Sequence, residues 1–461
     1  MSAQAFTMFR RSQKGRGTHM VVCQSAMARG GMPSLSSPRR HCSPRRAAIP
    51  CRAIDQGEIS MTHHRLSRRA LIGSAGTLAA LPLRARAQNQ PIRVGVLGDE
   101  SSYSADAGGP GSILAARMAA ADFGPTLLGR SIEILHADTL NKADIASTTA
   151  RNWFDQGVDA IIDMPATPVA AAASGVAAEK NKICMITAAA SLEFTTKWCK
   201  PTTIMWADDT HALAAGAAIP TVRAGGKSWY FITVDFAFGI SLENQIRQIV
   251  EADGGRILGS SRYQQNNSDF SAQLLAAQAS GAQVIGLCSV AGDLVNAIKQ
   301  ASEFGIQRGG KQQLTAFLVY ITDINALGAQ TVQGLTFSSS FYWNANDSAR
   351  AFSKRFMAEH KAPPTREQAQ VYAGTLHFLK SIAQAGTTET MAVRRAMTAL
   401  PAAYHGQTAQ VRGDGRVLFD VTRYRVKAPA QITVPWDYYE AAGTLPAAEA
   451  FLPIEAACSF V

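Results

Sequence analysis

Two short segments in the first half of the chain combine small side chains with hydroxyl groups: Ala166-Thr167 and Ala189-Ala190-Ser191. Each follows an apolar run and precedes a stretch with helical character, so each offers backbone amides and a hydroxyl at a helix start. Such a helix start binds anions, because amide donors and the positive end of the helix dipole act together. These residues are candidates to bind a ligand carboxylate. The alternative is that Thr167 and Ser191 only cap their helices.

Aromatic residues occupy other loops of the chain. Phe236 and Phe238 lie just after an apolar run, Tyr320 follows another, Tyr103 lies in a glycine-rich loop, and Trp206 lies where the first half of the chain ends. Aromatic side chains are costly to expose at loop tips and commonly line ligand pockets. We therefore predict that these five form the walls of a pocket for a small organic molecule. The alternative is that they pack between two lobes of the protein.

Signatures of catalysis and of metal binding do not occur in the sequence. It contains no G-x-S-x-G, no P-loop, no H-E-x-x-H and no C-x-x-C. The glycine-rich run at 108–111 includes Pro110, which removes a backbone donor, and no lysine follows it. We expect neither enzymatic activity nor a cofactor nor a metal ion.

The net charge of +11 belongs to the first part of the chain. Residues 1–87 hold 15 of the 45 Lys and Arg but 2 of the 34 Asp and Glu, so the remainder carries 30 basic and 32 acidic residues. Nucleic-acid binding requires a basic face on the folded domain, and the remainder has no excess of basic residues to form one. We therefore expect no nucleic-acid partner.

The basic N-terminal part has the order of an export signal. Arg68-Arg69 precedes an apolar stretch at 73–83, and Ala85-Arg86-Ala87 supplies small residues for cleavage. The arginine pair is typical of twin-arginine signals. We predict a signal peptide at 61–87, cleaved near Ala87, after a non-native or unstructured extension at 1–60; the alternative is a short buried helix. The first residue after the cut is Gln88 rather than the cysteine that a lipid anchor requires, and no stretch is long enough to span a bilayer. We expect a free, monomeric periplasmic protein.

Four of the seven cysteines follow this signal. Cys184 and Cys288 lie within apolar runs and are interpreted as buried. Cys199 and Cys458 lie in polar surroundings, where an oxidising compartment could join them in a disulfide that ties down the C-terminal tail. Their spacing alone leaves open whether they pair.

Strands and helices must position the candidate site. Apolar runs alternate with helical stretches from residue 92 to about 208, and the same pattern restarts after Asp209. This alternation is typical of parallel sheets with helices on both faces, and it predicts two successive α/β blocks. Ligands bind at the carboxyl ends of parallel strands. The loops expected there are 98–111, 163–168 and 187–194 in the first block, and 234–239, 289–293 and 320–323 in the second.

Over residues 91–440 the chain resembles the periplasmic substrate-binding proteins of branched-chain amino acid (Liv-type) ABC transporters. The resemblance is carried by several short stretches: 92–98 with the loop 103–111, NKAD at 141–144, EKNK at 179–182, WADDTHALA at 206–214, AFG at 237–239, DFS at 269–271, NAIKQA at 296–301, FYW at 341–343 and PWDYY at 435–439.

The resemblance implies two Rossmann-like lobes joined by three hinge crossovers, with the ligand in the cleft between them. It divides the chain into an N-lobe at 88–208 and 338–415, a C-lobe at 209–337, and a C-lobe return strand with a C-terminal tail at 416–461. It also implies closure of the lobes on the ligand and delivery to the permease and ATPase subunits of a transporter. A sensing subunit of the same fold, and less directly a hydrolase, are the alternatives.

The resemblance further assigns roles within the site. The segments 166–167 and 189–191 would hold a carboxylate, and Phe238 would form part of the pocket wall. Tyr320 stands where leucine-type members present an acid to the ligand's amino group, and Asp323 lies three residues further on. We therefore expect an aromatic or aliphatic carboxylic acid as the ligand rather than a branched-chain amino acid; an amino acid of another kind is the alternative.

Overall fold

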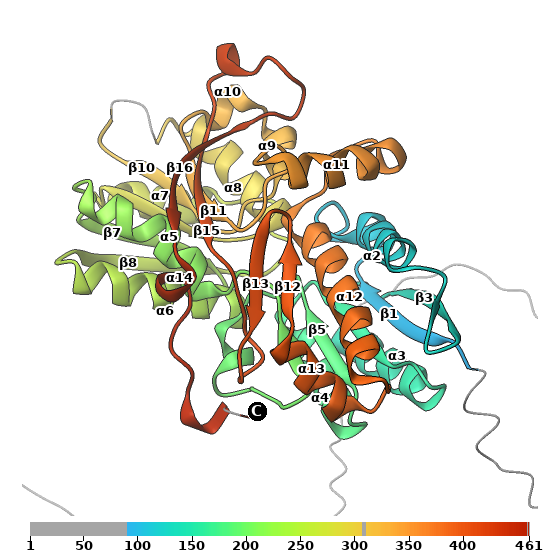
Figure 1. Ribbon diagram of the computed structural model, residues 1–461. Coiled ribbons are helices and arrows are strands. Elements are labelled where there is room, and N and C mark those ends of the chain that lie inside the picture. Colours follow the sequence, from blue (N-terminus) through green and yellow to red (C-terminus); the bar gives the residue numbers. More distant parts are fainter. Residues whose placement is uncertain (1–89, 307–309, 459, 461) are drawn as a thin grey trace, which may run out of the picture. The chain divides into compact units, whose positions relative to one another are not determined.

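The computed structural model describes residues 90–306, 310–458 and 460 (Figure 1). The predicted extension and signal peptide lie outside these residues. Within the described ranges, no helix has both the length and the apolar character needed to cross a membrane.

The N-lobe is built on a six-stranded sheet in the order β2-β3-β1-β4-β5-β6. The pairs among β3, β1, β4, β5 and β6 are parallel, and β2 runs antiparallel to β3. Strands β4 and β5 are buried along their whole length, as expected for a parallel sheet covered on both faces. The strands span Ile92–Gly98 (β1), Thr126–Leu127 (β2), Arg130–Asp138 (β3), Ala160–Asp163 (β4), Ile183–Ile186 (β5) and Thr203–Met205 (β6).

Helices from distant parts of the chain cover the two faces of this sheet. Helices α3 (Ala143–Asp155) and α4 (Thr167–Glu179) pack together and share one core cluster with β5. On the other face, α2 (Gly109–Phe123) packs against α12 (Arg366–Ala385), which arrives much later in the chain (Figure 1). The later part of the N-lobe also contains α11 (Asp347–His360), α13 (Thr390–Ala399) and a small antiparallel sheet of β12 (Pro401–Tyr404), β13 (Gln407–Val411) and β14 (Val417–Leu418).

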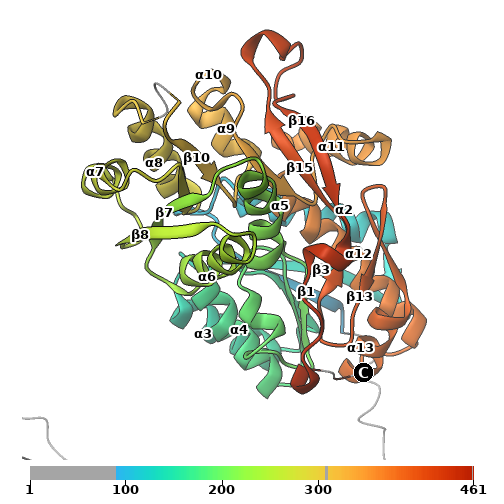
Figure 2. The same cartoon turned by 90° about the vertical axis from the view of Figure 1, so that its left-hand side faces the viewer.

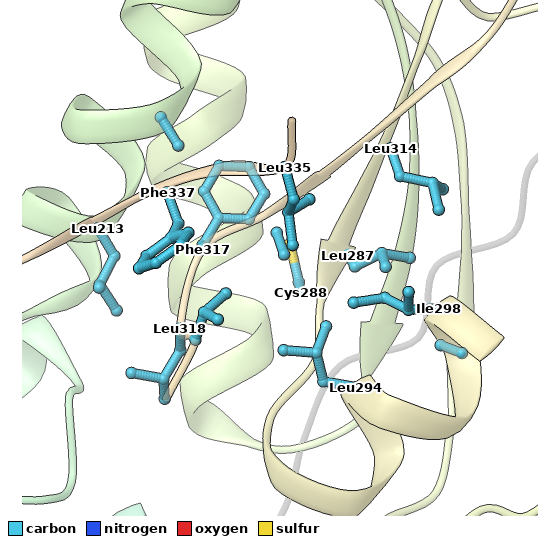
Figure 3. Close-up of a cluster of buried hydrophobic side chains, with 14 of the residues drawn as sticks. Leu213, Leu287, Cys288, Leu294, Ile298, Leu314, Phe317, Leu318, Leu335 and Phe337 are labelled. Carbon is cyan, nitrogen blue, oxygen red and sulfur yellow. The ribbon is translucent and has the colours of Figure 1, made fainter. Parts of the chain in front are cut away.

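The C-lobe has a four-stranded parallel sheet in the order β10-β9-β7-β8. Its strands are β7 (Ser228–Val234), β8 (Arg256–Tyr263), β9 (Val284–Cys288) and β10 (Gln313–Ala316). Its helices are α5 (Thr210–Arg223), α6 (Ala237–Ala252), α7 (Ser271–Ala279), α8 (Ala291–Glu303), α9 (Ile321–Leu327) and α10 (Ala329–Val332). Figure 3 shows part of the core, to which Leu213 of α5, Leu294 of α8 and Phe317 contribute.

A third sheet joins the lobes. Strands β11 (Thr336–Ser339), β15 (Val421–Val426) and β16 (Tyr439–Leu445) pair antiparallel, and Figure 2 shows β15 beside β16. The chain passes between the lobes before α5, after β11 and between β14 and β15, which makes the three crossovers that the resemblance implies. The alternating strands and helices confirm the predicted α/β fold class.

Three details differ from the sequence-based expectations. The return strand expected at the start of 416–461 is interrupted at 419–420 and forms β14 and β15. The tail expected after it contains a further strand, β16, although its sequence YEAAGTL has little intrinsic strand preference. Pairing with β15 stabilises this strand, so β16 forms because of a tertiary contact and not because of a local strand preference. The hairpin β12–β13 was also not expected.

The C-terminal tail returns to the N-lobe after β16. Helix α14 (Ala447–Ala450) is followed by Phe451, whose ring belongs to the N-lobe core and lies 4.5 Å from the Arg416 guanidinium. Cys458 and Cys199 form a disulfide with a Cα–Cα distance of 5.8 Å, which settles the pairing that spacing left open. Cys184 and Cys288 are free and buried, as predicted.

Candidate functional site

A cavity lies where the carboxyl ends of the two parallel sheets face each other. All six loops expected to form a ligand site contribute residues to its wall. The loops at 98–111, 163–168 and 187–194 supply the N-lobe side, and those at 234–239, 289–293 and 320–323 supply the C-lobe side. This convergence follows from the fold, because the loops after parallel strands emerge at one edge of each sheet.

The N-lobe wall contains most of the residues proposed for carboxylate binding. Tyr103, Ala166, Thr167, Ala189 and Ala190 all line the cavity. Ala166 is the N-cap of α4 and has no side chain with which to cap, so the first amides of the helix are not capped by a side chain. The Thr167 hydroxyl is buried, and it has no hydrogen-bond partner among the described residues. The capping alternative therefore does not account for Thr167.

The backbone beside this wall is held in unusual conformations. Asp163 and Met164 have φ of 95° and 65°, at the end of β4, and Ala291 has φ of 52° at the start of α8. Positive φ in a residue other than glycine costs on the order of 1–3 kcal/mol and tends to occur at functional sites. Ala291 lines the cavity and Asp163 immediately precedes the lining residues, so each of the two facing walls has a strained residue on it or beside it.

The C-lobe wall is aromatic and apolar. Phe236 and Phe238, whose ring centroids are 6.1 Å apart, lie at the N-terminus of α6 and line the cavity with Tyr320. Val290 and Ala291 form the wall at the start of α8. Phe238 is only 3% exposed, so a ligand would meet a fixed ring rather than a mobile one.

Two tyrosine hydroxyls bridge the lobes at the cavity. Tyr103 of the N-lobe donates to the Val290 carbonyl at 2.6 Å and lies 3.2 Å from Asp293 Oδ2. Burial raises the pKa of Asp293 to about 6, so this carboxyl takes up a proton more readily than a free aspartate. Tyr320 of the C-lobe donates to Glu367 Oε2 at 3.1 Å. These contacts hold the lobes together around the cavity.

Two of the candidate residues do not reach the cavity wall. The Ser191 hydroxyl hydrogen-bonds to Glu193 at the start of a 3-10 turn, Leu192–Thr195. Trp206 is fully buried in the N-lobe core, against Tyr404 at a ring distance of 6.1 Å.

Asp323 does not reach the wall either. It caps α9 by accepting the Tyr320 backbone amide at 2.8 Å, and burial raises its pKa to about 7.

Several lining residues were absent from the candidate set. Ser104, Ala107 and Ala188 belong to expected loops and could have been included on that ground. Gln265, after β8, and Glu367, in the first turn of α12, had no such signal. Glu367 reaches the cavity only because α12 packs beside α2, a contact between segments far apart in the chain. Among the residues that the structure places, no cluster of three or more His, Cys, Asp or Glu is suited to hold a metal ion.

Comparison with known proteins relates this architecture to solved structures. A periplasmic binding protein from Burkholderia mallei is 38% identical, with a TM-score of 0.76 over 79% of this chain and 96% of that one. A branched-chain amino acid ABC transporter periplasmic ligand-binding protein from Burkholderia xenovorans is 34% identical, with a TM-score of 0.71 over 78% and 97%.

A more distant structure shares the fold. A solute-binding protein of an ABC transporter from R. palustris, in complex with 4-hydroxybenzoate, is 18% identical, with a TM-score of 0.70 over 78% of this chain and 98% of that one. No curated protein matches the chain.

The family resemblance seen in the sequence is confirmed by a family model. The model described as "Periplasmic binding protein" matches residues 91–431, which include both lobes and the cavity. The chain therefore belongs to the family of periplasmic binding proteins that serve ABC transporters.

Proposed function

We propose that this protein is an exported receptor that binds a small carboxylate, aromatic or aliphatic, between its lobes and delivers it to the permease of an ABC uptake system. One observation carries the proposal. The Thr167 hydroxyl is buried, lacks a partner in the described structure, and lies at the first position of α4 on the cavity wall. A buried hydroxyl without a partner is unfavourable, and a ligand oxygen would satisfy it.

The electrostatics of the cavity favour an anion. Helices α4, α6, α8 and α12 all place residues of their first turn on the wall: Thr167, Phe238, Ala291 and Glu367. Their N-terminal amides and dipoles direct positive partial charge toward the cavity. No Lys, Arg or His belongs to its lining in the part of the chain that the structure covers. An anion would therefore be held by backbone dipoles and hydroxyls.

The shape of the opposite wall favours an apolar body on the ligand. Phe236, Phe238, Tyr103 and Tyr320 supply rings on several sides of the cavity. Aromatic walls bury apolar area and stack on ring ligands. The complex of the distant R. palustris protein with 4-hydroxybenzoate shows that the same fold accommodates a ligand of this kind.

The amino-acid alternative is less well supported. Asp323, the acid closest in sequence to the expected ammonium position, is engaged in capping α9 and does not line the cavity. The proposal therefore does not require an amino group on the ligand.

The disulfide supports the exported location. Cys199–Cys458 links residues 259 positions apart, and disulfides of this structural kind persist mainly in oxidising compartments. This agrees with the signal peptide predicted at 61–87.

A ligand panel in a thermal-shift assay tests the proposal. The panel comprises benzoate, 4-hydroxybenzoate, hexanoate, leucine and the neutral amide benzamide. A ligand at about 100 times its dissociation constant adds about 2.7 kcal/mol to the free energy of unfolding. We expect shifts with one or more acids that lack an amino group and none with benzamide. Incubation should return the acid unchanged. A shift with leucine alone, or turnover of the acid, would refute the proposal.

A matched pair of variants locates the site. Thr167→Val removes the unpaired hydroxyl at the cavity and should weaken carboxylate binding about tenfold, the value of one hydrogen bond to a charged group. Thr375→Val is the control, because the Thr375 hydroxyl on α12 is likewise buried without a partner in the described structure but does not line the cavity. Equal affinities of the two variants would place the carboxylate elsewhere.

A further inference from the structure

Three side-chain oxygens beside the cavity are buried without hydrogen-bond partners in the described structure. Asp163 Oδ2, Glu367 Oε1 and Ser112 Oγ are all buried, and none has a hydrogen-bond partner among the described residues. They come from β4, α12 and α2. A Cβ on Gly108 would collide with Glu367 Oε1 and crowd Ser112 Oγ, so the glycine leaves room for both groups.

A single shared proton resolves this arrangement. A proton on Glu367 lets that group donate to Asp163, and the Ser112 hydroxyl can donate to Asp163 as well. Burial and the neighbouring Asp163 raise the pKa of Glu367 well above its ordinary value, and burial raises that of Asp163 to about 6. The N-terminus of α12 favours an ionised Glu367, but two buried carboxylates in contact disfavour it more strongly.

The charged groups around the pair are already engaged. Arg366 donates to Asp208 Oδ2 at 3.2 Å, and its guanidinium lies 5.2 Å from the centre of the Tyr320 ring. Asp99 accepts from the Ser104 amide at 2.7 Å and from Asn141. No cation in the described structure forms an ion pair with Asp163 or Glu367. The charge of Arg366 favours the ionised form of Glu367, but its guanidinium is paired with Asp208, so a proton is what neutralises the Asp163–Glu367 pair.

The second oxygen of Glu367 is turned toward the C-lobe. Oε2 accepts the Tyr320 hydroxyl at 3.1 Å, and both residues line the cavity. A carboxylic acid that donates through Oε1 keeps Oε2 as a carbonyl-type acceptor, which has one remaining lone pair. A ligand hydroxyl has one proton to donate, which matches the one lone pair that remains on Oε2. An ammonium group has three protons to satisfy and would lie among helix N-termini.

We infer that Glu367 is a neutral carboxylic acid within the ligand cavity and that, beside Tyr320, it recognises an uncharged hydroxyl group on the ligand. This inference rests on the proposed function and narrows it. The ligand is then a carboxylate with a second polar group that carries no charge, such as a hydroxylated aromatic acid. Glu367 determines this specificity, while Asp163 and Ser112 position its proton.

Two ligands of matched shape test the inference by isothermal titration. 4-(Hydroxymethyl)benzoate and 4-(aminomethyl)benzoate differ only in a hydroxyl or an ammonium group at the same position. We expect the hydroxymethyl compound to bind at least tenfold more tightly at pH 7. The affinity of the protein for the hydroxymethyl compound should fall as pH rises from 6 to 8.5, by at most tenfold per pH unit. The reason is that Glu367 retains its proton in the closed, ligand-bound cavity and releases it in the open one. Titrations in buffers of different ionisation enthalpy should show proton uptake.

Variants separate Glu367 from other titrating groups. Glu367→Gln imitates the protonated acid, so the pH dependence and the proton uptake should disappear. Glu303→Gln, on the exposed side of α8, is the matched control and should behave as the wild type. A pH dependence that persists in Glu367→Gln but disappears in Asp293→Asn would assign the proton to the Tyr103 contact and overturn the inference.

The remaining outcomes are equally distinct. Tighter binding of the aminomethyl compound, with affinity rising with pH and proton release, would show an ionised acid that binds ammonium and would refute the inference. If the wild type binds benzoate but ignores both the para substituent and the pH, the inference alone fails. If it binds none of the acids, the proposed function fails too.

Discussion

The disulfide between Cys199 and Cys458 should contribute strongly to the stability of the folded chain. The double variant Cys199→Ser/Cys458→Ser removes the bond without leaving an unpaired thiol. The bond closes a loop of 259 residues, and the loop-entropy model gives about 5.5 kcal/mol for a loop of that length. The model treats the unfolded chain as random, so this value is an upper bound.

The structure indicates what the loss would do to the tail. Phe451 packs in the N-lobe core, and Arg416 lies over its ring, so the tail has contacts of its own and should remain docked. With about 2.1 cal/mol/K of unfolding entropy per residue, the 367 described residues convert 5.5 kcal/mol into a fall in Tm of about 7 °C.

Differential scanning calorimetry, with and without reductant, checks this value. The wild type in reductant should melt at the temperature of the double variant, and reductant should leave the variant unchanged. A variant that melts within 1–2 °C of the oxidised wild type would refute the entropy argument. A variant that responds to reductant as strongly as the wild type would show that another thiol is responsible.

Three further predictions concern the cavity and the partly buried His405. Phe238→Ala removes a buried ring of the cavity wall, and the burial of such a ring is worth roughly 1.5–3 kcal/mol. The affinity for an aromatic acid, measured by titration, should therefore fall about 10- to 100-fold. An unchanged affinity would show that the ring does not face the ligand. Tyr103→Phe removes the hydroxyl that donates to Val290 at 2.6 Å, so ligand release in stopped flow should be about fivefold faster; an unaltered rate would show that this contact does not hold the closed lobes. Burial lowers the pKa of His405 to about 4, so its contribution to stability is present above the unfolded value near 6.5 and is lost as pH falls toward 4. The urea midpoint of the wild type should therefore fall more between pH 7.5 and 4.5 than that of His405→Gln, and equal falls would contradict this assignment.

Much of the site could be predicted because it depends on local order. Tyr103, Thr167 and Phe238 lie in loops that directly follow apolar strands, and a parallel sheet brings such loops to one edge whatever its detailed packing. Trp206 was placed in the site on its aromatic type and on its position at the end of the first α/β block. Its position after β6 instead buries it in the N-lobe core, where it contacts Tyr404.

The sequence by itself determined the α/β class, the two lobes and the family, since these follow from periodicity and from short stretches of matching residues. The tertiary structure decided which groups meet. Glu367 faces Asp163 and Tyr320 because α12 returns to pack beside α2, and Cys458 reaches Cys199 because β16 leads the tail back to the N-lobe. Such contacts depend on chain crossings between distant segments, and no local pattern of residues encodes them.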